Sequence, residues 1–372
     1  MQKKLIAVAV LGACVAGSAL AANVDVYGRI DTGLSYVHQK IGDQAGTDTL
    51  SMDSGMSSGN RWGLKGSEDL GNGYQVGFVL ESGFDADTGA MSKDGLFNRE
   101  ATLRVSGPFG SIYAGRMGRI GSDAGSVGFY AGSVSPFGSG WGKMPGHFAV
   151  TANYDSRYNN ALAYVSPKVG PVTVYAQYTM GNATENESGD DRLFSLGAQA
   201  DFGALQVLGL VEYLNKQSTV AGTNGTPNVT HNDSLYDDSY TINLGGSYDF
   251  GVAKVFLAGQ YFNAAPNFAG QGGDWEKSFD GFGVNVGASA PIGAGEFLVS
   301  AGYGKGDYHF DTKDTNLSAD SYIFQVGYTY PFSKRTNLYA GAGYHQTTME
   351  KEASKDSKTK TTQVMFGLLH KF

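Results

Sequence analysis

Apolar and polar residues alternate with a period of two along several segments of the chain. Residues 24–34 set an aliphatic face against a polar face that includes Arg29 and Asp31, and residues 241–250 and 322–330 alternate in the same way. Period-two alternation is the signal of a β-strand with two different faces. About ten residues is also the length of a tilted strand that crosses a bilayer. The pattern therefore predicts a chain made mainly of β-strands.

Turn signals of Gly, Pro, Asn and Asp recur between these segments. The clusters begin at Asp69, Gly107, Pro167, Asp201, Asp249, Pro291 and Pro331, which lie 38, 60, 34, 48, 42 and 40 residues apart. An interval of about 40 residues holds two strands of about ten residues and one longer polar loop, as in a meander of hairpins. The interval from 107 to 167 is about 20 residues longer than that, which indicates an unusually long loop.

The turns divide the chain into sixteen predicted strands. They begin near residues 24, 61, 74, 97, 111, 157, 172, 193, 205, 239, 253, 281, 296, 321, 336 and 362. An even number places both chain ends on the short-turn side, as a closed barrel requires. We therefore predict an all-β fold, a 16-stranded antiparallel transmembrane β-barrel with short periplasmic turns and long external loops. A soluble β-sandwich or lectin would also explain the strands, but not their uniform spacing.

Composition agrees with a membrane barrel. Mean hydropathy is only −0.23, yet the chain holds 55 Gly and 43 Tyr plus Phe. Membrane barrels average to low hydropathy because lipid-facing residues alternate with polar ones, and aromatic girdles mark both interfaces. The expected girdle near the long loops is Tyr178, Tyr213, Tyr261, Tyr303, Tyr328 and Tyr344, and near the turns Phe202 and Phe250.

The first 21 residues predict a secretory signal peptide. Lys3 and Lys4 precede an apolar run over residues 5–16, and residues 19–21 (Ala-Leu-Ala) form a small-x-small cleavage pattern. An uncleaved spanning helix would need about 20 apolar residues, and a lipoprotein-type cleavage before Cys14 is a further alternative. We expect a single barrel domain over residues 22–372.

Removing this segment removes Cys14, the one cysteine. The remaining chain can form no disulfide and no thiolate metal site, and we predict neither a metal nor a cofactor. Its net charge is −10, from 25 Lys and Arg against 35 Asp and Glu. This argues against nucleic acid as a partner.

Six stretches resemble a known family in the right order along the chain. They are VYGRIDTG at 26–33, SGNRWGLKGSEDLG at 58–71, LESGF at 80–84, FGSIYAGR at 109–116, RYNN at 157–160 and GLLHKF at 367–372. They resemble the trimeric general porins of Gram-negative outer membranes, especially the branch typical of β-proteobacteria. The resemblance implies a homotrimer in contact with outer-membrane lipid and lipopolysaccharide. It also implies a terminal aromatic, here Phe372, that the barrel-assembly machinery recognises.

The family's third external loop folds into the lumen and narrows it. Its place in this chain is residues 117–155, the long interval, and an ordered loop of this length is usually functional. Its predicted residues of interest are Arg119, Ser135, Pro136, Phe137, Gly138 and Lys143. An outward fold, as an exposed lid, is the alternative.

Charged side chains around a constriction set the selectivity of such a pore. Arg61 alternates with Trp62 and Leu64, so it should face the lumen. The same test, together with the resemblance, gives further candidates: Lys65, Glu81, Arg99, Arg104, Arg116, Asp123 and Arg157. Arg99 and Arg104 lie on opposite faces of one predicted strand, so only one fits simple alternation. Each of these arginines could instead form a structural ion pair at a strand end.

The loop is poor in carboxylates compared with many relatives. The turn Ser135-Pro136-Phe137-Gly138 has no acid where they carry a Glu, and only Asp123 and Asp155 lie within the loop. Arg119 and Lys143 oppose them, and His147 adds charge only at lower pH. A basic wall facing this loop predicts a mildly anion-selective pore.

The predicted function is a general diffusion porin, a passive channel for ions and small hydrophilic solutes in the outer membrane. A substrate-specific channel, for a sugar or an organic anion, is the nearer alternative. An outer-membrane barrel enzyme is the more distant one, because the chain has no His-Glu-x-x-His motif and no Gly-x-Ser-x-Gly nucleophile elbow in a strand-to-helix context.

Overall fold

The structure, a computed structural model, describes residues 23–372 apart from 153, 181–191, 216–218, 221–228, 231–237, 270, 273–276, 311–312 and 351–355. The predicted signal segment, residues 1–21, lies outside the described residues. Within them, no helix is long and apolar enough to cross a membrane.

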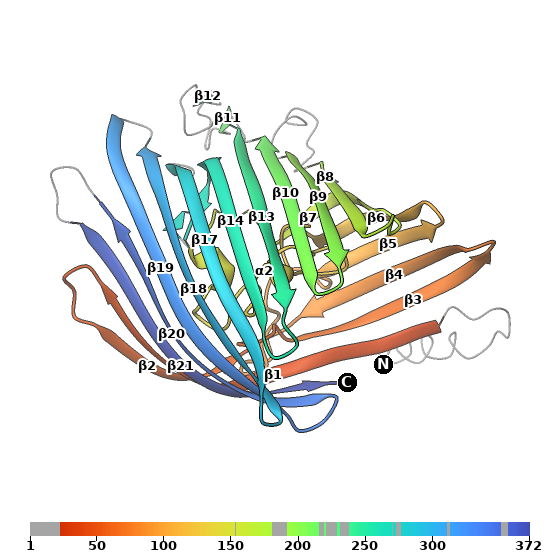
Figure 1. Cartoon of the computed structure of the whole chain (residues 1–372), viewed down its shortest axis with the longest axis horizontal. Helices are drawn as coiled ribbons and strands as arrows, with labels where there is room; N and C mark the ends of the chain where they lie inside the picture. Colours follow the sequence, from red (N-terminus) through yellow and green to blue (C-terminus); the bar gives the residue numbers. More distant parts are fainter. Residues whose placement is uncertain are drawn as a thin grey trace, which may run out of the picture.

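Sixteen antiparallel strands pair in chain order into a closed ring (Figure 1). They are β1 (Asn23–Ile41), β3 (Arg61–Gly71), β4 (Tyr74–Gly83), β5 (Glu100–Gly107), β6 (Gly110–Gly118), β7 (Arg157–Val165), β8 (Val172–Thr179), β9 (Arg192–Phe202), β10 (Leu205–Asn215), β13 (Ser239–Asp249), β14 (Lys254–Ala265), β17 (Lys277–Ile292), β18 (Gly295–Phe310), β19 (Lys313–Pro331), β20 (Thr336–Met349) and β21 (Ser357–Lys371). The last strand pairs with the first, from Arg29 opposite Lys371 to Ile41 opposite Thr359. The predicted 16-stranded antiparallel barrel is confirmed.

The connections differ strongly between the two ends of the barrel. Seven short turns of two to six residues lie at one end, and the longest connection at the other end spans residues 119–156. Asp-x-Gly sequences build some of these turns: Gly251 has φ 81° and donates its N–H to the Asp249 carboxylate at 2.7 Å. A backbone in this left-handed region suits Gly because it has no Cβ. Turn chemistry visible in the sequence thus fixes the hairpins.

The second barrel strand differs from the prediction. It begins at β2 (Thr47–Ser54), which pairs with the outer half of β1, and resumes as β3 after an interruption at residues 55–60. The buried Asp31 carboxylate holds this bend, because it accepts hydrogen bonds from the backbone N–H groups of Ser57 (2.8 Å) and Ser58 (2.7 Å). The polar segment before Arg61 concealed the first half of the strand.

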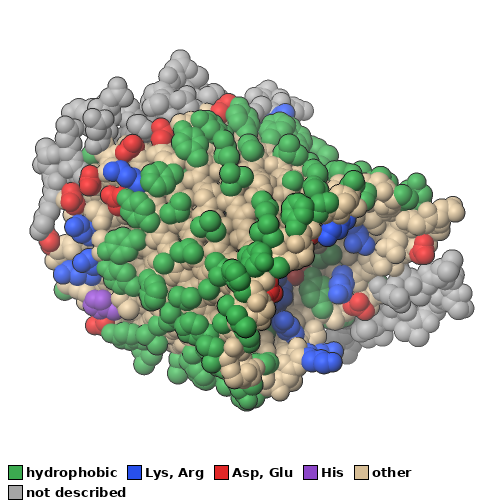
Figure 2. Space-filling view, in the orientation of Figure 1, with side chains coloured by type: hydrophobic (Ala, Val, Ile, Leu, Met, Phe, Trp, Pro, Cys, Tyr) green, Lys and Arg blue, Asp and Glu red, His purple; other side chains and the backbone are tan. Residues whose placement is uncertain are grey.

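The outer surface of the barrel is apolar and the inner surface is polar. Val26 (67%) and Leu244 (65%) are among the exposed large apolar side chains. Apolar side chains are spread broadly over the face of the barrel seen in Figure 2. Ser35, Asn243 and Gln363 are buried inside. A soluble protein has polar side chains outside and apolar ones inside. The opposite distribution found here is that of a barrel in lipid.

Aromatic side chains lie toward both ends, with one correction. Tyr213 and Tyr303 donate hydrogen bonds to Asp238 and Asp320 beside the external connections. Tyr328, expected near the long loops, instead donates to the Ile292 carbonyl at a short turn, 2.8 Å away. The prediction was wrong because β19 ends at Pro331, where the short turn to β20 begins, so Tyr328 lies near the short-turn end of the barrel.

Smaller elements lie in the long connections. A one-turn helix, α2 (Ala131–Val134), and a 3₁₀ turn, η1 (Gly146–Ala149), belong to the connection between β6 and β7. Two small hairpins occur elsewhere, β11 (Thr219–Val220) with β12 (Val229–Thr230), and β15 (Asn267–Phe268) with β16 (Gln271–Gly272).

Candidate pore constriction

The connection between β6 and β7 folds into the barrel. Here it is called the constriction loop, residues 119–156. Ile120, Val134 and Val150 are fully buried, and α2 lies inside the ring of strands (Figure 1). An external lid would leave these apolar side chains in water, so the fold places the loop in the lumen.

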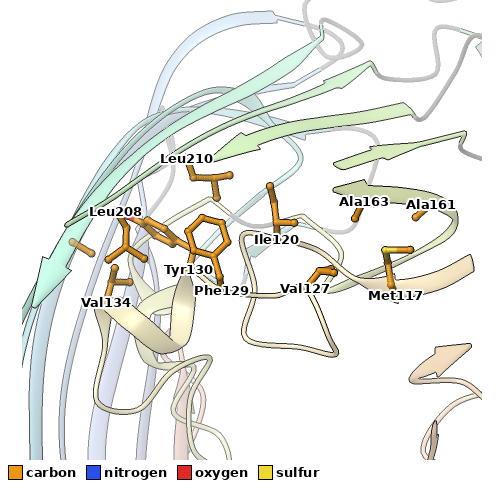
Figure 3. Close-up of a cluster of buried hydrophobic side chains, with 11 residues drawn as sticks. Met117, Ile120, Val127, Phe129, Tyr130, Val134, Ala161, Ala163, Leu208 and Leu210 are labelled. Atoms are coloured by element: carbon orange, nitrogen blue, oxygen red, sulfur yellow. The ribbon is translucent and has the colours of Figure 1, made fainter. Parts of the chain in front are cut away.

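The first half of the loop packs on the inner wall through an apolar cluster (Figure 3). The loop residues Ile120, Val127, Phe129, Tyr130 and Val134, together with Met117 at the end of β6, meet Ala161 and Ala163 of β7 and Leu208 and Leu210 of β10. Glycines on the wall make room, because a Cβ at Gly197 would lie 2.7 Å from the Phe129 ring and one at Gly245 would lie 2.5 Å from Val134. Small inward residues thus specify where the loop sits.

Three inward glutamines bind the loop's backbone. Their amide oxygens accept loop N–H groups: Gln177 from Ile120 (3.0 Å), Gln260 from Ala152 (2.6 Å) and Gln363 from Lys143 (2.7 Å). Gln177 also donates to the carbonyl of Gly118, the last residue of β6, at 2.8 Å, and Gln260 donates to the loop carbonyl of Ala152 at 3.2 Å. A buried backbone group without a hydrogen-bond partner is destabilising. These amides supply that partner and so allow the loop to lie inside the barrel.

A buried ion pair fixes the start of the loop. The Arg119 guanidinium lies 2.5 Å from the Glu212 carboxylate on β10, and the two side chains are 3% and 1% exposed. Ser195 donates a further hydrogen bond to Glu212 at 3.1 Å, and Arg119 lies over the Tyr154 ring. Arg119 was expected to contribute to the charge of the pore, but this pairing turns it into the wall.

A second connection also folds inward, and the sequence did not predict it. Phe268, between β14 and β17, is completely buried and packs on Phe262 and Phe279, with ring centroids 5.1 and 6.0 Å away. The neighbouring Ala269 donates its N–H to the Thr151 carbonyl at 3.3 Å. This segment therefore braces the end of the constriction loop.

Opposite these contacts, a cavity of about 650 Å³ separates the loop from strands β1, β3, β4 and β5 and the start of β7. Its charged lining consists of Arg29, Arg61, Lys65, Glu81, Arg99, Glu100, Asp123 and Arg157. In Figure 2, Lys and Arg side chains gather in the hollow at the right of the view. Five cationic side chains thus face three carboxylates.

The carboxylates are engaged by neighbouring donors. Glu81 accepts a hydrogen bond from Arg99 Nε at 2.7 Å and lies 3.7 Å from Arg61. Glu100 accepts from the Ser126 hydroxyl at 2.5 Å. Asp123 accepts from the Ser139 N–H at 2.9 Å. The negative charge is held close to the wall and loop, and the excess charge of the cavity is positive.

The chain matches the Gram-negative porin family over residues 7–349. It belongs to this family. An outer membrane porin protein of Bordetella pertussis is 34% identical over 409 aligned positions that cover all of both chains. Outer membrane porin protein 32 of Delftia acidovorans is 40% identical over 117 residues, 31% of this chain and 32% of the relative. The anion-selective porin from Comamonas acidovorans has the same fold, with a TM-score of 0.65 and 23% identity over 94% of this chain and 100% of its own. The protein is an outer-membrane porin.

The porin's structure resolves the ambiguity between two arginines. Arg99 precedes β5, which begins at Glu100, so the alternation of the strand does not constrain it. Arg104 lies on the inward face of β5 opposite Gly77, where a Cβ would be 3.3 Å from its guanidinium, but it does not line the cavity. Both arginines therefore point inward, at different levels of the pore.

Several predicted site residues lie away from the cavity. Arg116 shares a strand face with the exposed Ile112 and bonds to Asn159 at 2.6 Å, so it belongs to the outer side of β6. Among the predicted loop residues, only Phe137 lines the cavity; the others, away from it, are Arg119, Ser135, Pro136, Gly138 and Lys143. Pro136 packs instead against the wall, where a Cβ at Gly287 would lie 2.6 Å away.

Sequence reasoning missed part of the lining. Arg29 donates a hydrogen bond to Ser58 at 2.5 Å, and Tyr27 donates one to Glu81 at 3.0 Å. Both lie on the polar face of the first strand, so alternation could have identified them. Residues in the bend at 55–59 also line the cavity. Alternation could not identify them, because they lie between β2 and β3 and not in a strand. Within the described part of the chain, no three His, Asp or Glu side chains form a group that could hold a metal ion.

Proposed function

We propose that this porin is a passive, water-filled channel for ions and small hydrophilic solutes, with a mild preference for anions. The observation that carries the proposal is the excess of cationic side chains around the cavity, five against three carboxylates. Charged groups lining a pore set ion selectivity. The solved porin with the same fold from Comamonas acidovorans is itself described as anion-selective. No catalytic role is proposed.

The constriction in this proposal lies between the constriction loop and the wall residues Arg29, Arg61, Arg99 and Arg157. The three carboxylates lower the positive charge of the constriction but do not reverse it. Each of them already accepts at least one hydrogen bond within the protein. Arg157 has a weaker local partner, the Ser156 hydroxyl at 3.5 Å. Its charge is therefore well placed to meet a passing anion.

The proposed assembly is a homotrimer that contacts outer-membrane lipid and lipopolysaccharide. Phe372 exchanges backbone hydrogen bonds with Gly28, both at 3.1 Å, so the last residue closes the barrel seam. This supports a role for the C-terminal strand as the assembly signal read by the barrel-assembly machinery.

A channel specific for organic anions is the second candidate. Tyr27, Phe137 and Phe148 line the same cavity as the arginines, and an aromatic surface beside cations suits solutes that carry both apolar and carboxylate groups.

Planar-bilayer recordings test both candidates. A tenfold KCl gradient should give a reversal potential of the sign set by chloride, and clear cation selectivity would overturn the anion preference. Conductance should rise linearly with KCl concentration. Saturation, or block by one organic anion but not by its neutral analogue, would favour the specific channel instead.

A further inference from the structure

The bend between β2 and β3 lies beside three of the arginines that line the cavity. Residues 55–59 separate these two strands (Figure 1). Gly55 and residues 57–59 line the cavity together with Arg29, Arg61 and Arg99. A backbone that leaves its strand loses the hydrogen bonds of the sheet, and its N–H and C=O groups need other partners. The conformation of the bend must therefore be held by groups outside the sheet ladder.

The bend contacts each of the three arginines in a different way. The Arg29 guanidinium donates a hydrogen bond to the Ser58 hydroxyl at 2.5 Å. Arg61 Nε donates to the Gly59 carbonyl at 3.0 Å. Arg99 lies against the same glycine, where a Cβ would be 3.1 Å from its guanidinium. An arginine side chain has many rotamers in the absence of such contacts, so the position of the bend determines where these three charges lie.

The bend is anchored by the carboxylate of Asp31 on β1, which is completely buried and does not line the cavity. One carboxylate oxygen accepts hydrogen bonds from the N–H and the hydroxyl of Ser57, both at 2.8 Å, and from the N–H of Ser58 at 2.7 Å. The other oxygen accepts one from the hydroxyl of Tyr339 on β20 at 2.5 Å. A buried charge is costly unless it is hydrogen-bonded, and these four donors satisfy Asp31.

The bend also contacts the constriction loop. The Met56 carbonyl accepts a hydrogen bond from the Gly142 N–H at 2.8 Å. The Met56 side chain belongs to the same buried apolar cluster as Phe137 and Trp141. Tyr339 is a further member of this cluster, and its ring centroid lies 5.5 Å from that of Trp141. The bend thus joins the basic wall to the loop that faces it.

We propose that Asp31 is a positioning residue for ion selectivity, because it fixes Arg29, Arg61 and Arg99 at the constriction through the bend. The inference rests on the proposed pore function and adds that selectivity depends on the placement of these charges as well as on their number. The negative charge of Asp31 itself acts in the opposite direction, since it disfavours anions. Removing that charge alone should raise the anion preference, whereas releasing the bend should lower it.

Reversal potentials of the whole porin in a KCl gradient separate the two effects. Asp31→Asn removes the charge but keeps an oxygen that accepts from the bend, so the chloride-to-potassium permeability ratio should equal or exceed that of the wild type. Asp31→Ala removes both acceptor oxygens and releases the bend. Moving a charge from about 4 to about 8 Å from an ion halves their interaction energy in water, so the ratio should fall about twofold for each arginine displaced.

Tyr339→Phe tests the same anchor without any change of charge. It removes one donor to the Asp31 carboxylate, and the ratio should fall, though less than in Asp31→Ala. Asp249→Ala is the matched control, because the Asp249 carboxylate also holds a backbone bend, at a short turn, where it accepts the Gly251 N–H at 2.7 Å. This variant should have the permeability ratio of the wild type.

A ratio for Asp31→Ala that equals or exceeds that of Asp31→Asn would overturn the inference, because only the charge would then matter. An equal fall in Asp249→Ala would overturn it as well. If Asp31→Ala yields no folded channels, an unchanged ratio in Tyr339→Phe has the same consequence. Each variant is compared with the wild type, so a cation-selective wild type would refute the proposed anion preference and still leave the role of Asp31 to be read from the shifts.

Discussion

At the scale of single residues, the charges of this porin divide into those that face solutes and those that hold the fold. Arg157 lines the cavity, whereas Arg119 is buried against Glu212. Both belong to the region predicted to be basic, yet a substitution should affect different properties at the two positions. Replacing Arg157 should change ion selectivity, and replacing Arg119 should change stability.

Replacing Arg157 with Gln should weaken the anion preference. A unit charge about 4 Å from an ion contributes about 1 kcal/mol in water, so the chloride-to-potassium permeability ratio should fall by up to about fivefold. Reversal potentials in a KCl gradient measure it. Lys334→Gln, at a short turn, is the matched control and should leave the ratio unchanged; an equal shift in both variants would contradict a local effect.

Replacing either partner of the Arg119–Glu212 pair should destabilise the protein strongly. Removing one member leaves an unpaired buried charge, at a cost of about 3–5 kcal/mol. Urea unfolding in lipid vesicles should show this loss for Arg119→Met and for Glu212→Leu, and a much smaller loss for the double variant. Additive losses would mean that the two side chains do not act as a pair.

The buried ring of His147 predicts a pH dependence of the constriction loop. Burial, with a smaller contribution from Arg119, lowers the pKa of His147 to about 4. A loop released from the wall would return it to about 6.5, so the released state binds more protons between these values. The packed loop is therefore fully stable above about pH 6.5 and loses stability as pH falls toward 4.

Open-channel current noise should reveal this loss. We expect noise to grow between pH 6.5 and 4 in the wild type and to stay constant in a His147→Gln variant. His38→Gln, in which the altered ring is outside the lumen, should behave like the wild type. Noise that is independent of pH in the wild type would contradict the prediction.

At the scale of elements, the alternating strands were predictable and the inward connections were only partly so. The long interval between two turns located the constriction loop, because loop length is visible in the sequence. The inward path of Phe268 was not visible, since its partners Phe262, Phe279 and Tyr308 come from three barrel strands. Such a cluster exists only after those strands pair.

The Phe268 segment should rigidify the constriction loop. A buried Phe replaced by Ala costs about 3–5 kcal/mol, and Phe268→Ala also removes the packing behind Thr151. We expect an intact barrel by circular dichroism but more frequent current fluctuations in single-channel records. Phe332→Ala, at an exposed turn position, is the control. Identical records for Phe268→Ala and the wild type would show that the loop is held without this brace.

At the scale of the whole molecule, closure depends on the seam between β1 and β21. The Phe372 ring lies over Gly28, where a Cβ would be 2.4 Å away. The sequence marked Phe372 through the resemblance of the terminal strand, but the role of Gly28 as the surface beneath its ring required the closed barrel.

Gly28→Val should displace the Phe372 ring and weaken the seam. The expected result is less heat-resistant, folded porin in outer-membrane fractions, measured by electrophoretic mobility with and without boiling. Gly259→Val is a suitable control, because a Cβ there meets nothing within 4 Å. Equal amounts of folded protein in both variants would mean that the seam tolerates a displaced ring.

The sequence by itself determined the number of strands, their two faces and the position of the long loop. These properties are local, since alternation and turn chemistry act over a few residues. Only the tertiary structure decided which charges meet across the lumen. It buried Arg119 against a carboxylate 93 residues away, placed Arg99 outside its strand and brought Arg29 into the cavity. Contacts across a barrel depend on strand register and closure, which no short segment contains.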